Sequence, residues 1–464
     1  MNTISSQNPF FETYSTLHST VPFDKIKTGD YVPAIREGIR RQNAEIEAII
    51  RNPEVPTFAN TVLAYEKSGE MLHRVSTVFG NLLSAETDDD LQELAKEIMP
   101  MMSEHENNIS LNEELFARIK AVYEQQDKET LSPEQHKLLE DIYNGFVRNG
   151  ANLLGEDKEK YRALCKELSL LTLQFSENNL KETNDYKLVI TDKSQLAGLP
   201  ESAVEAAAET AGEKGVEGWV FTLQAPSYGP FLTYADSRDL RRELYMAYNT
   251  KCTHDNASNN LEIVKKLANV RMEIAQLLGY DNFAEYNLQE RMAQNSESVY
   301  KLLDQLLEAY TPTAKQEYAE VQALARQAEG EDFVLMPWDW AYYSHKLKDR
   351  KFNIDDELLR PYFELNNVKQ GVFGLATRLY GITFKKNPDI PVYHKDVDAY
   401  EVFDKDGKFL AVFYTDFHPR AGKRSGAWMT SYKEQWIDEK TGENSRPHIS
   451  IVMNFTKPTQ DKPA

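Results

Sequence analysis

Apolar residues recur at helical spacing through most of the first half of this 464-residue chain. The clearest stripe lies in residues 157–179 and consists of Tyr161, Leu164, Leu168, Leu171 and Phe175. Residues three and four apart lie on one face of an α-helix, and an apolar face of this kind is stable when another element covers it. We therefore predict a mainly α protein in which this stripe packs into a core.

Similar patterns predict the other helices. They lie at residues 33–51, 60–85, 88–102, 112–124, 133–149, 201–211, 237–248, 260–278, 296–326, 338–348, 355–361 and 370–380. We expect an interruption at Pro312, because proline lacks an amide hydrogen and its ring clashes with the preceding turn. Pro226 to Pro230 is rich in turn residues and predicts a break between regular elements.

Two parts of the chain have the composition of β-strands. Residues 186–190 and 218–223 are short strand candidates. After Ile382, residues 400–403 and 409–414 flank Asp-Lys-Asp-Gly, which predicts a hairpin, and residues 426–432 and 449–455 are further candidates. The sequence thus predicts a helical region (1–185), a small β-containing insertion (186–232), a second helical region (233–381) and a β-rich subdomain (382–464).

The charge balance excludes some classes of partner. Asp and Glu number 73 against 53 Lys and Arg, a formal net charge of −20. Binding to nucleic acid or an anionic membrane requires clustered cations, so we expect neither. No apolar run reaches the ~18 residues that span a bilayer, and the first residues lack a signal-peptide pattern, which predicts a cytoplasmic protein. Cys165 and Cys252 stand apart and predict buried or partly buried free thiols.

Histidine spacing bears on metal binding. The nine histidines include no two that are four residues apart, so no helix can present two imidazoles to one metal ion. The nearest imitation, His105-Glu106, lacks the second histidine, and we expect it on solvated surface near a helix end. The sequence predicts no metal ligand and no catalytic residue in this chain.

Several short blocks occur in the order found in one peptidase family. They are Asn8-Pro9-Phe10, Phe58-Ala59-Asn60-Thr61, Leu277-Leu278-Gly279-Tyr280, Gln289-Glu290-Arg291-Met292-Ala293, Pro337-Trp338-Asp339-Trp340-Ala341-Tyr342-Tyr343, Leu359-Arg360-Pro361-Tyr362-Phe363-Glu364-Leu365, Tyr380-Gly381-Ile382-Thr383-Phe384 and the run from Gly422 to Met429. Together they cover nearly the whole chain. The set resembles the thimet oligopeptidase-like zinc metallopeptidases, most closely the bacterial dipeptidyl carboxypeptidases (peptidyl-dipeptidases).

The resemblance implies a fold and a chemistry. The family fold is a multi-helical ellipsoid of the zincin type with a deep channel and small β-subdomains. A His-Glu-x-x-His helix and a downstream Glu hold zinc, and the Glu between the two histidines activates the zinc-bound water. The products are C-terminal dipeptides of short peptides. The resemblance covers only the N-terminal part of the family and stops before this motif, so we expect zinc in the complete family protein and neither zinc nor activity in this chain alone.

The implied partners are short peptides and the segment that carries the motif, in the same or a separate chain. Two alternatives stay open. One is a general oligopeptidase of the same family, and the other is a noncatalytic helical peptide-binding or scaffold protein. If the family's channel walls are shared with later segments, this chain alone should expose apolar faces, such as the stripe in residues 157–179, and associate.

The candidate substrate cleft lies at Arg424, Ser425, Gly426, Ala427 and Trp428. Small residues permit close backbone approach, and an edge strand can pair with an extended peptide. We predict that residues 425–428 form a strand beside a groove toward which Ala464 points; the alternative is an ordinary β-subdomain with a turn at Gly426.

Two further clusters have functional and structural interpretations. Trp338, Asp339, Tyr342 and Tyr343 either line the channel or form an aromatic core. Arg420, Lys423 and Arg424 either bind a peptide carboxylate or make ordinary ion pairs.

Overall fold

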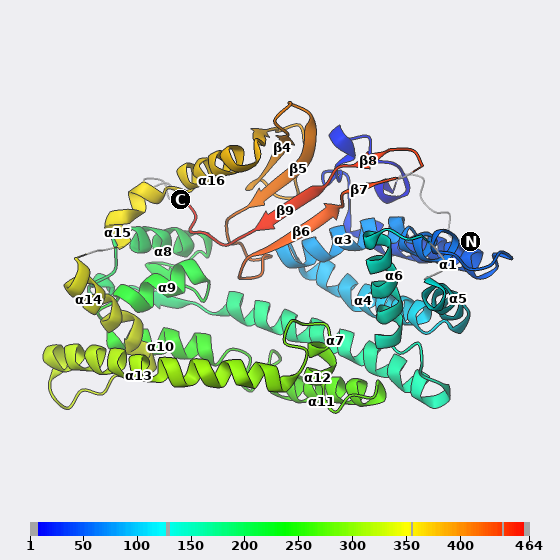
Figure 1. Ribbon diagram of the computed structural model, residues 1–464. Coiled ribbons are helices and arrows are strands. Elements are labelled where there is room, and N and C mark those ends of the chain that lie inside the picture. Colours follow the sequence, from blue (N-terminus) through cyan, green and yellow to red (C-terminus); the bar gives the residue numbers. More distant parts are fainter. Residues whose placement is uncertain (1–7, 127–129, 354–355, 439, 459–464) are drawn as a thin grey trace.

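The computed structural model describes residues 8–126, 130–353, 356–438 and 440–458, and it confirms the mainly α class. Figure 1 shows long helices beneath one larger sheet. The helices are α1 (Tyr31–Ile50), α2 (Leu63–Glu66), α3 (Glu70–Ala85), α4 (Asp89–Ser110), α5 (Glu113–Glu124), α6 (Pro133–Arg148), α7 (Gly155–Asp185), α8 (Glu201–Glu213), α9 (Ala225–Tyr234), α10 (Arg238–Asn249), α11 (Leu261–Leu277), α12 (Phe283–Leu288), α13 (Ser296–Glu329), α14 (Trp340–Phe352), α15 (Asp356–Leu359) and α16 (Leu365–Tyr380). Among the described residues, no helix is long and apolar enough to span a membrane.

The larger sheet has five strands in the order β3-β4-β5-β9-β6. They are β3 (Thr383–Lys386), β4 (Val397–Phe403), β5 (Phe409–Asp416), β6 (Trp428–Lys433) and β9 (His448–Val452). β4 and β5 pair antiparallel, which confirms the predicted hairpin, whereas β5 and β9 pair parallel. Two short strands, β7 (Trp436–Ile437) and β8 (Asn444–Ser445), form a ribbon between β6 and β9.

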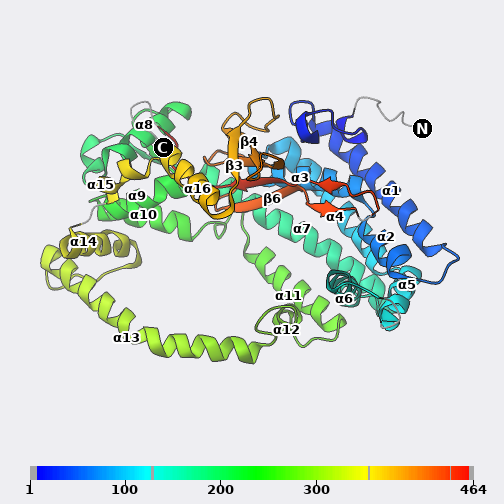
Figure 2. The same ribbon diagram turned by 45° about the horizontal axis from the view of Figure 1, so that its top comes forward.

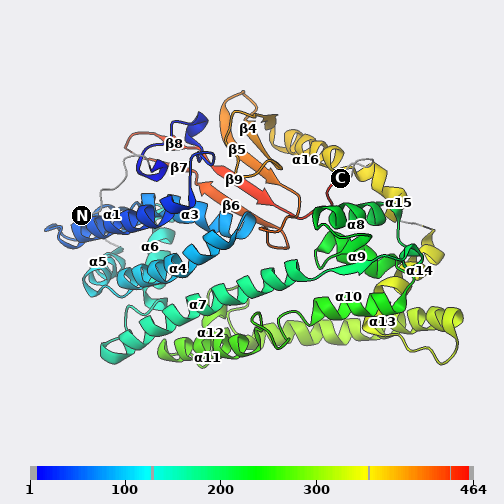
Figure 3. The same cartoon turned by 180° about the vertical axis from the view of Figure 1, so that it is seen from behind.

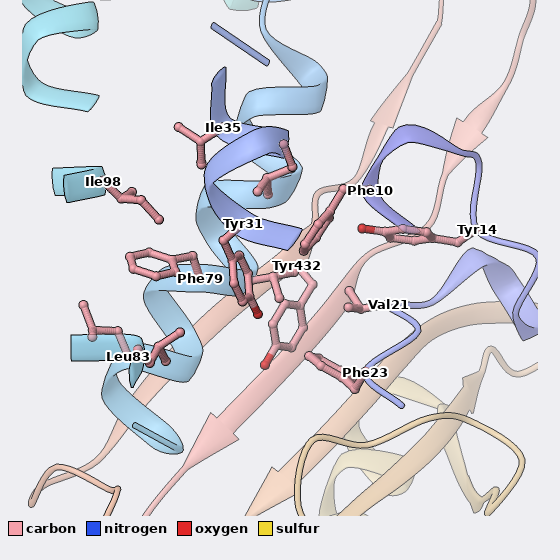
Figure 4. Packing of buried hydrophobic residues seen from close by; sticks show 14 of the residues in the cluster. Phe10, Tyr14, Val21, Phe23, Tyr31, Ile35, Phe79, Leu83, Ile98 and Tyr432 are labelled. Atoms are coloured by element: carbon pink, nitrogen blue, oxygen red, sulfur yellow. The ribbon is translucent and has the colours of Figure 1, made fainter. Parts of the chain in front are cut away.

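Helices α1, α3 and α4 and the N-terminal segment share a core with this sheet (Figure 4). Tyr31 lies between Phe10 and Phe79, with ring centroids 5.4 and 5.3 Å away. On β6, buried Tyr432 accepts a hydrogen bond from the Asn81 side chain of α3, which in turn accepts one from Thr430 at 3.1 Å. These bonds fix the edge of the sheet on the helical layer.

Three further apolar clusters hold together parts of helices and strands that lie outside this core. The last turn of α1 packs with α5 and α6, and α7 packs with α11. Tyr161, Leu164 and Leu171 are buried there, which confirms the predicted core for these members of the stripe in residues 157–179, whereas Phe175 is 39% exposed. The strands β1 (Leu188–Ile190) and β2 (Trp219–Phe221) pair antiparallel and pack with α8, α9 and α10. The division into four regions stays a prediction.

The structure differs from the predictions in where helices are interrupted. The helix expected over residues 60–85 breaks at Gly69, whose φ of 76° is left-handed. Pro226 lies in the first turn of α9 instead of breaking the chain, because proline is well suited to that position, and Pro230 lies inside the same helix. α13 continues through Pro312; this proline is exposed, so water can satisfy the carbonyl that loses its partner.

Two helices expose large apolar faces. On α13, the residues Tyr300, Leu303, Leu307 and Tyr310 share one face and are all more than half exposed. On α16, the residues Val368, Val372, Leu375 and Leu379 also share one face, and their exposed fractions are 39–64%. α13 runs along the side opposite the sheet (Figure 2). The expectation that the stripe on α7 would be exposed is wrong for Leu164 and Leu171, because α11 and α4 cover that face.

We predict that this chain self-associates through these two faces, because contiguous exposed apolar surface favours burial between molecules. Replacing Leu303 and Leu307 with Gln should lower the associated fraction in size-exclusion chromatography with light scattering. Replacing Lys301 and Lys315 of the same helix is the control and should change little. A monodisperse 53.3 kDa monomer of the unaltered chain would contradict the prediction.

Candidate substrate-binding site

Strand β6 lies at the end of the sheet order and pairs with β9 alone among the described strands. Its second edge therefore carries backbone groups that no strand of the described chain pairs. Met429 on this strand is 62% exposed, while Tyr432 further along is buried against α3. Figure 3 shows the edge position of β6 from behind. An unpaired edge of this kind can accept an extended peptide as a further strand.

The predicted strand at residues 425–428 is wrong for its first three residues. β6 begins at Trp428, and Ser425, Gly426 and Ala427 form an exposed turn before it. Gly426 has a φ of 103°, which is incompatible with extended pairing and favours glycine. The Asn454 side chain donates to the carbonyl oxygens of Arg424 and Gly426 at 3.0 and 2.8 Å, so it satisfies these groups in place of a strand. The chain end at Ala464 lies outside the described residues.

A buried carboxylate organises the loop that leads to this turn. Asp416, at the end of β5, is fully buried. Arg420 donates two hydrogen bonds to its carboxylate at 2.8 and 2.7 Å, Lys423 donates one at 2.8 Å, and the Tyr393 hydroxyl one at 2.7 Å. Burial alone would raise the pKa of Asp416, but these hydrogen bonds outweigh it and hold the pKa below its ordinary value.

The same loop is fastened to the C-terminal end of α3. Arg420 donates to the carbonyl of Ala85 at 2.6 Å and pairs with Glu86. The amide of Thr87 donates to the carbonyl of Gly422 at 2.8 Å. A Cβ at position 422 would lie 2.3 Å from the Thr87 carbonyl oxygen, so this contact requires glycine. The loop geometry before β6 is thus set by backbone and ionic contacts.

A pocket of about 150 Å³ lies between this loop, α7 and the start of α9. Its polar lining includes Arg424, Ser425, Asn179, Asn184 and Gln224. Asn184 also donates to the carbonyl of Ala421 at 2.8 Å, which ties α7 to the loop. Two of the predicted cleft residues, Arg424 and Ser425, therefore border a pocket, whereas Gly426, Ala427 and Trp428 do not line it.

The three cations of the loop differ in their partners. Arg420 and Lys423 make ion pairs with Asp416, as the structural interpretation predicted. Arg424 is half-buried, and its guanidinium has no ion pair or hydrogen bond within the described chain. Burial lowers the pKa of Arg424 because it disfavours the charged form.

The cluster around Trp338 is a structural core. Asp339 is fully buried and pairs with Arg238 at 2.7 Å and Arg241 at 3.1 Å. Tyr342 and Tyr343 are buried in the cluster that joins α13 and α14. Trp338 itself is partly exposed and borders a separate depression. The aromatic-core interpretation therefore holds for Asp339 and the two tyrosines.

The expectation of a solvated His105 is wrong. This residue faces inward from α4, is only 4% exposed, and hydrogen-bonds the side-chain oxygen of Gln42 at 2.7 Å. Burial lowers the pKa of His105, which favours the neutral ring. Cys165 is partly buried and Cys252 buried, and both are free, as predicted.

The sequence did not predict Asp416 and Asn454, which position the loop. It also did not predict the side-chain amides of Asn179 and Asn184 on α7, which line the pocket. A signal existed for Asp416, because it ends an apolar strand and three cations follow within eight residues. Asn454, Asn179 and Asn184 carry no local signal, since each acts across a distance in the chain that only the fold closes.

Comparison with known proteins gives the family. The family model described as Peptidase family M3 matches residues 231–464. The chain is 39% identical over 464 residues to dipeptidyl carboxypeptidase of Escherichia coli K12, covering 99% of this chain and 67% of the relative. The chain belongs to peptidase family M3.

Other relatives extend the comparison. Oligopeptidase A of Escherichia coli K12 is 33% identical, covering 96% of this chain and 65% of the relative. A probable cytosolic oligopeptidase A of Arabidopsis thaliana is also 33% identical, covering 99% and 66%. A solved structure of PZ peptidase A with inhibitor 2 is 17% identical with a TM-score of 0.47, covering 92% of this chain and 60% of that one. The chain thus spans about two thirds of its relatives' length.

The M3 peptidases are metallopeptidases, but the residues that the structure describes do not fit a zinc site. In the described part of the chain, no three His, Cys, Asp or Glu side chains converge as metal ligands. The most buried carboxylate near the pocket, Asp416, already has its oxygens occupied by Arg420, Lys423 and Tyr393.

We predict that Asp416→Asn lowers the free energy of unfolding by about 3 kcal/mol, because it leaves buried cations without their counter-ion. The effect depends on pH. A carboxylate whose folded pKa is depressed stabilises the fold above its unfolded pKa of about 3.9, and this contribution is lost as the pH falls from there through the folded pKa. Urea unfolding of both proteins between pH 7 and pH 3 should show the difference shrinking only at the acidic end.

The matched control is Asp141→Asn, which breaks an exposed pair with Lys137 and should leave the urea midpoint unchanged at neutral pH. Equal effects of the two substitutions would contradict the importance of the buried cluster.

Proposed function

We propose that this chain supplies the peptide-holding part of a zinc-dependent M3 peptidase that removes C-terminal dipeptides from short peptides in the cytoplasm. Alone, the chain holds no zinc and does not cleave. Arg424 and Ser425 border the substrate site, and Gly426, Ala427 and Trp428 form the turn and strand start beside it. The zinc ligands and the group that activates water belong to a separate segment of the complete peptidase.

The observation that carries this proposal is the unpaired edge of β6 beside a pocket. A peptide is held extended most simply by main-chain hydrogen bonds to such an edge, and these bonds do not depend on the peptide's side chains. Gly426 and Ala427 leave space at the start of the strand. The chain is 39% identical to dipeptidyl carboxypeptidase of Escherichia coli K12, and this similarity supports the removal of C-terminal dipeptides as the activity of the complete peptidase.

A general oligopeptidase is the second candidate, because relatives at 33% identity carry that name. Both candidates need the same edge strand, and they differ in whether the peptide's C-terminal carboxylate is recognised. The noncatalytic scaffold predicted as an alternative would need the edge as well, without a zinc-binding segment.

The edge-strand proposal predicts an alternation in peptide binding. In a β-pair, successive backbone amides point to opposite sides. The parent is an unmodified tetrapeptide, and two isomers each carry one N-methyl group, at neighbouring inner residues. One isomer should therefore bind this chain much more weakly than the parent, and the other about equally. Calorimetric titration measures the three affinities. Equal loss for both isomers, or no binding of the parent, would refute strand addition.

The absence of paired histidines predicts that the purified chain binds no stoichiometric zinc, because two imidazoles one helical turn apart are missing. Metal analysis after dialysis against zinc should show only traces. The E. coli relative, treated in parallel, is the positive control. Zinc retained by every molecule of this chain would overturn the prediction.

A further inference from the structure

Asn454 stands opposite Gly426 at the point where the ladder between β6 and β9 ends. The antiparallel register pairs Trp428 with Val452, so two further residues along both strands would bring Gly426 opposite Asn454. The ladder nevertheless stops at Trp428, because the φ of 103° at Gly426 turns the chain away from β9. The two residues therefore meet through the Asn454 side chain and not through paired backbones.

The main chain around Asn454 is held by the other neighbour of β9. The amides of Met453 and Phe455 donate to the carbonyl oxygens of Asp416 and Phe417, both at 2.7 Å. These bonds continue the parallel pairing of β9 with β5 beyond the end of both strands. The side chain of Asn454 thus extends towards the turn from a backbone that is hydrogen-bonded on its far side.

One side-chain nitrogen fixes two peptide groups of the turn. The Asn454 Nδ2 donates to the carbonyl oxygens of Arg424 at 3.0 Å and of Gly426 at 2.8 Å. Carbonyl oxygens only accept hydrogen bonds, so the nitrogen and not the oxygen of the side-chain amide must face them. Each of its two hydrogens serves one carbonyl, and this sets the orientation of both peptide planes.

The orientation of these planes also directs two backbone donors. In a trans peptide group the N–H points opposite to the C=O, and no described peptide bond is cis. The amides of Ser425 and Ala427 belong to the two groups whose carbonyls face Asn454, so both N–H groups point away from it. Neither amide has an acceptor among the described residues, and both residues are exposed.

The spacing of the two donors matches a strand edge. Ser425 and Ala427 are two residues apart, which is the interval at which N–H groups recur along one side of an extended chain. An extended peptide presents its carbonyl oxygens at the same interval. The turn before β6 can therefore hold a peptide through its main chain although it is not itself a strand.

We propose that Asn454 is a positioning residue for the bound peptide. By holding the carbonyls of Arg424 and Gly426, it presents the amides of Ser425 and Ala427 to two main-chain carbonyl oxygens of a peptide that continues past the end of β6. The contact depends neither on the side chains of the peptide nor on its termini. The inference rests on the proposed function and deepens it, because it extends the peptide-holding edge by one turn and names the residue that shapes this turn.

The amide signal of Ala427 tests the inference. The sequence contains two Gly-Ala pairs, at Gly150-Ala151 and Gly426-Ala427, so glycine labelled with ¹³C at the carbonyl and alanine labelled with ¹⁵N select two amides in the NMR spectrum. The probe is acetyl-tetraalanine amide, which is uncharged at both ends. We expect its addition to move the proton signal of Ala427 downfield, because this amide gains an acceptor. Ala151, whose amide already donates to the Phe146 carbonyl at 3.0 Å, is the internal control and should not move.

Substitution of Asn454 separates positioning from a merely structural role. Asn454→Asp has nearly the same shape but lacks both donors, and Asn454→Ala lacks them without added charge. Both should abolish the shift of Ala427 and weaken peptide binding roughly 10-fold, the range for one to two hydrogen bonds. The urea midpoint should change little, because the Asn454 side chain is only half-buried. A structural role would instead lower the midpoint and leave the shift of Ala427 in the molecules that remain folded.

The matched control is Asn287→Asp on α12. Asn287 is also half-buried, and its side chain donates to the carbonyl of Phe283 at 2.9 Å. This substitution changes the net charge by the same amount and should alter neither the affinity nor the shift.

Gly426→Ala disturbs the turn without touching Asn454. A Cβ at this position would meet no atom within 4 Å, so the chain should fold, but a φ of 103° is strained for alanine. We expect this variant to lose the shift of Ala427 as well.

The outcomes separate the inference from the proposed function. Absence of peptide binding to the unaltered chain overturns the proposed function itself. Binding that leaves the Ala427 signal unmoved overturns the inference but leaves strand addition to β6 standing. A shift that survives in both Asn454→Asp and Asn454→Ala also overturns the inference, because the amide then reaches the peptide without Asn454.

Discussion

The buried carboxylate of Asp416 is the interaction on which the candidate site depends. It ends the central strand β5 and pairs with Arg420 and Lys423, so these two ion pairs tie the loop between β5 and β6 to the end of β5. Arg420 also binds the end of α3, which fixes the sheet to the helical layer. A buried charge of this kind is costly when any partner is removed. The position of Arg424 follows from it, because two fully paired cations precede it in the same loop.

The fold was predictable where burial is periodic. The stripe on residues 157–179 and the hairpin around Asp404 to Gly407 depend on local patterns; the hairpin was confirmed, and the stripe was confirmed as core except at the exposed Phe175. Pro312 and Pro226 were misjudged because the cost of proline depends on its position in a helix and on access of water to the freed carbonyl. Those conditions depend on the tertiary structure, so the neighbouring residues in the sequence do not predict them.

The site was predictable only in part. Arg424 and Ser425 border a pocket, while their role in a substrate cleft stays a prediction, and a turn at Gly426 replaces the predicted strand start. Asn454 satisfies the carbonyl groups of that turn from 28 and 30 residues away. The split between paired Arg420 and Lys423 and unpaired Arg424 also depends on which side chain reaches Asp416. Long-range polar contacts of this kind have no period in the sequence.

The central claim is that a peptide lies extended along the free edge of β6. The most direct measurement is photo-crosslinking with a tetrapeptide that carries a benzophenone at its N-terminus, followed by mass spectrometry of the labelled segment. Four extended residues span about 13 Å, which is shorter than β6 and the turn before it together. We therefore expect labelling within residues 425–433. Labelling away from this segment would contradict the account.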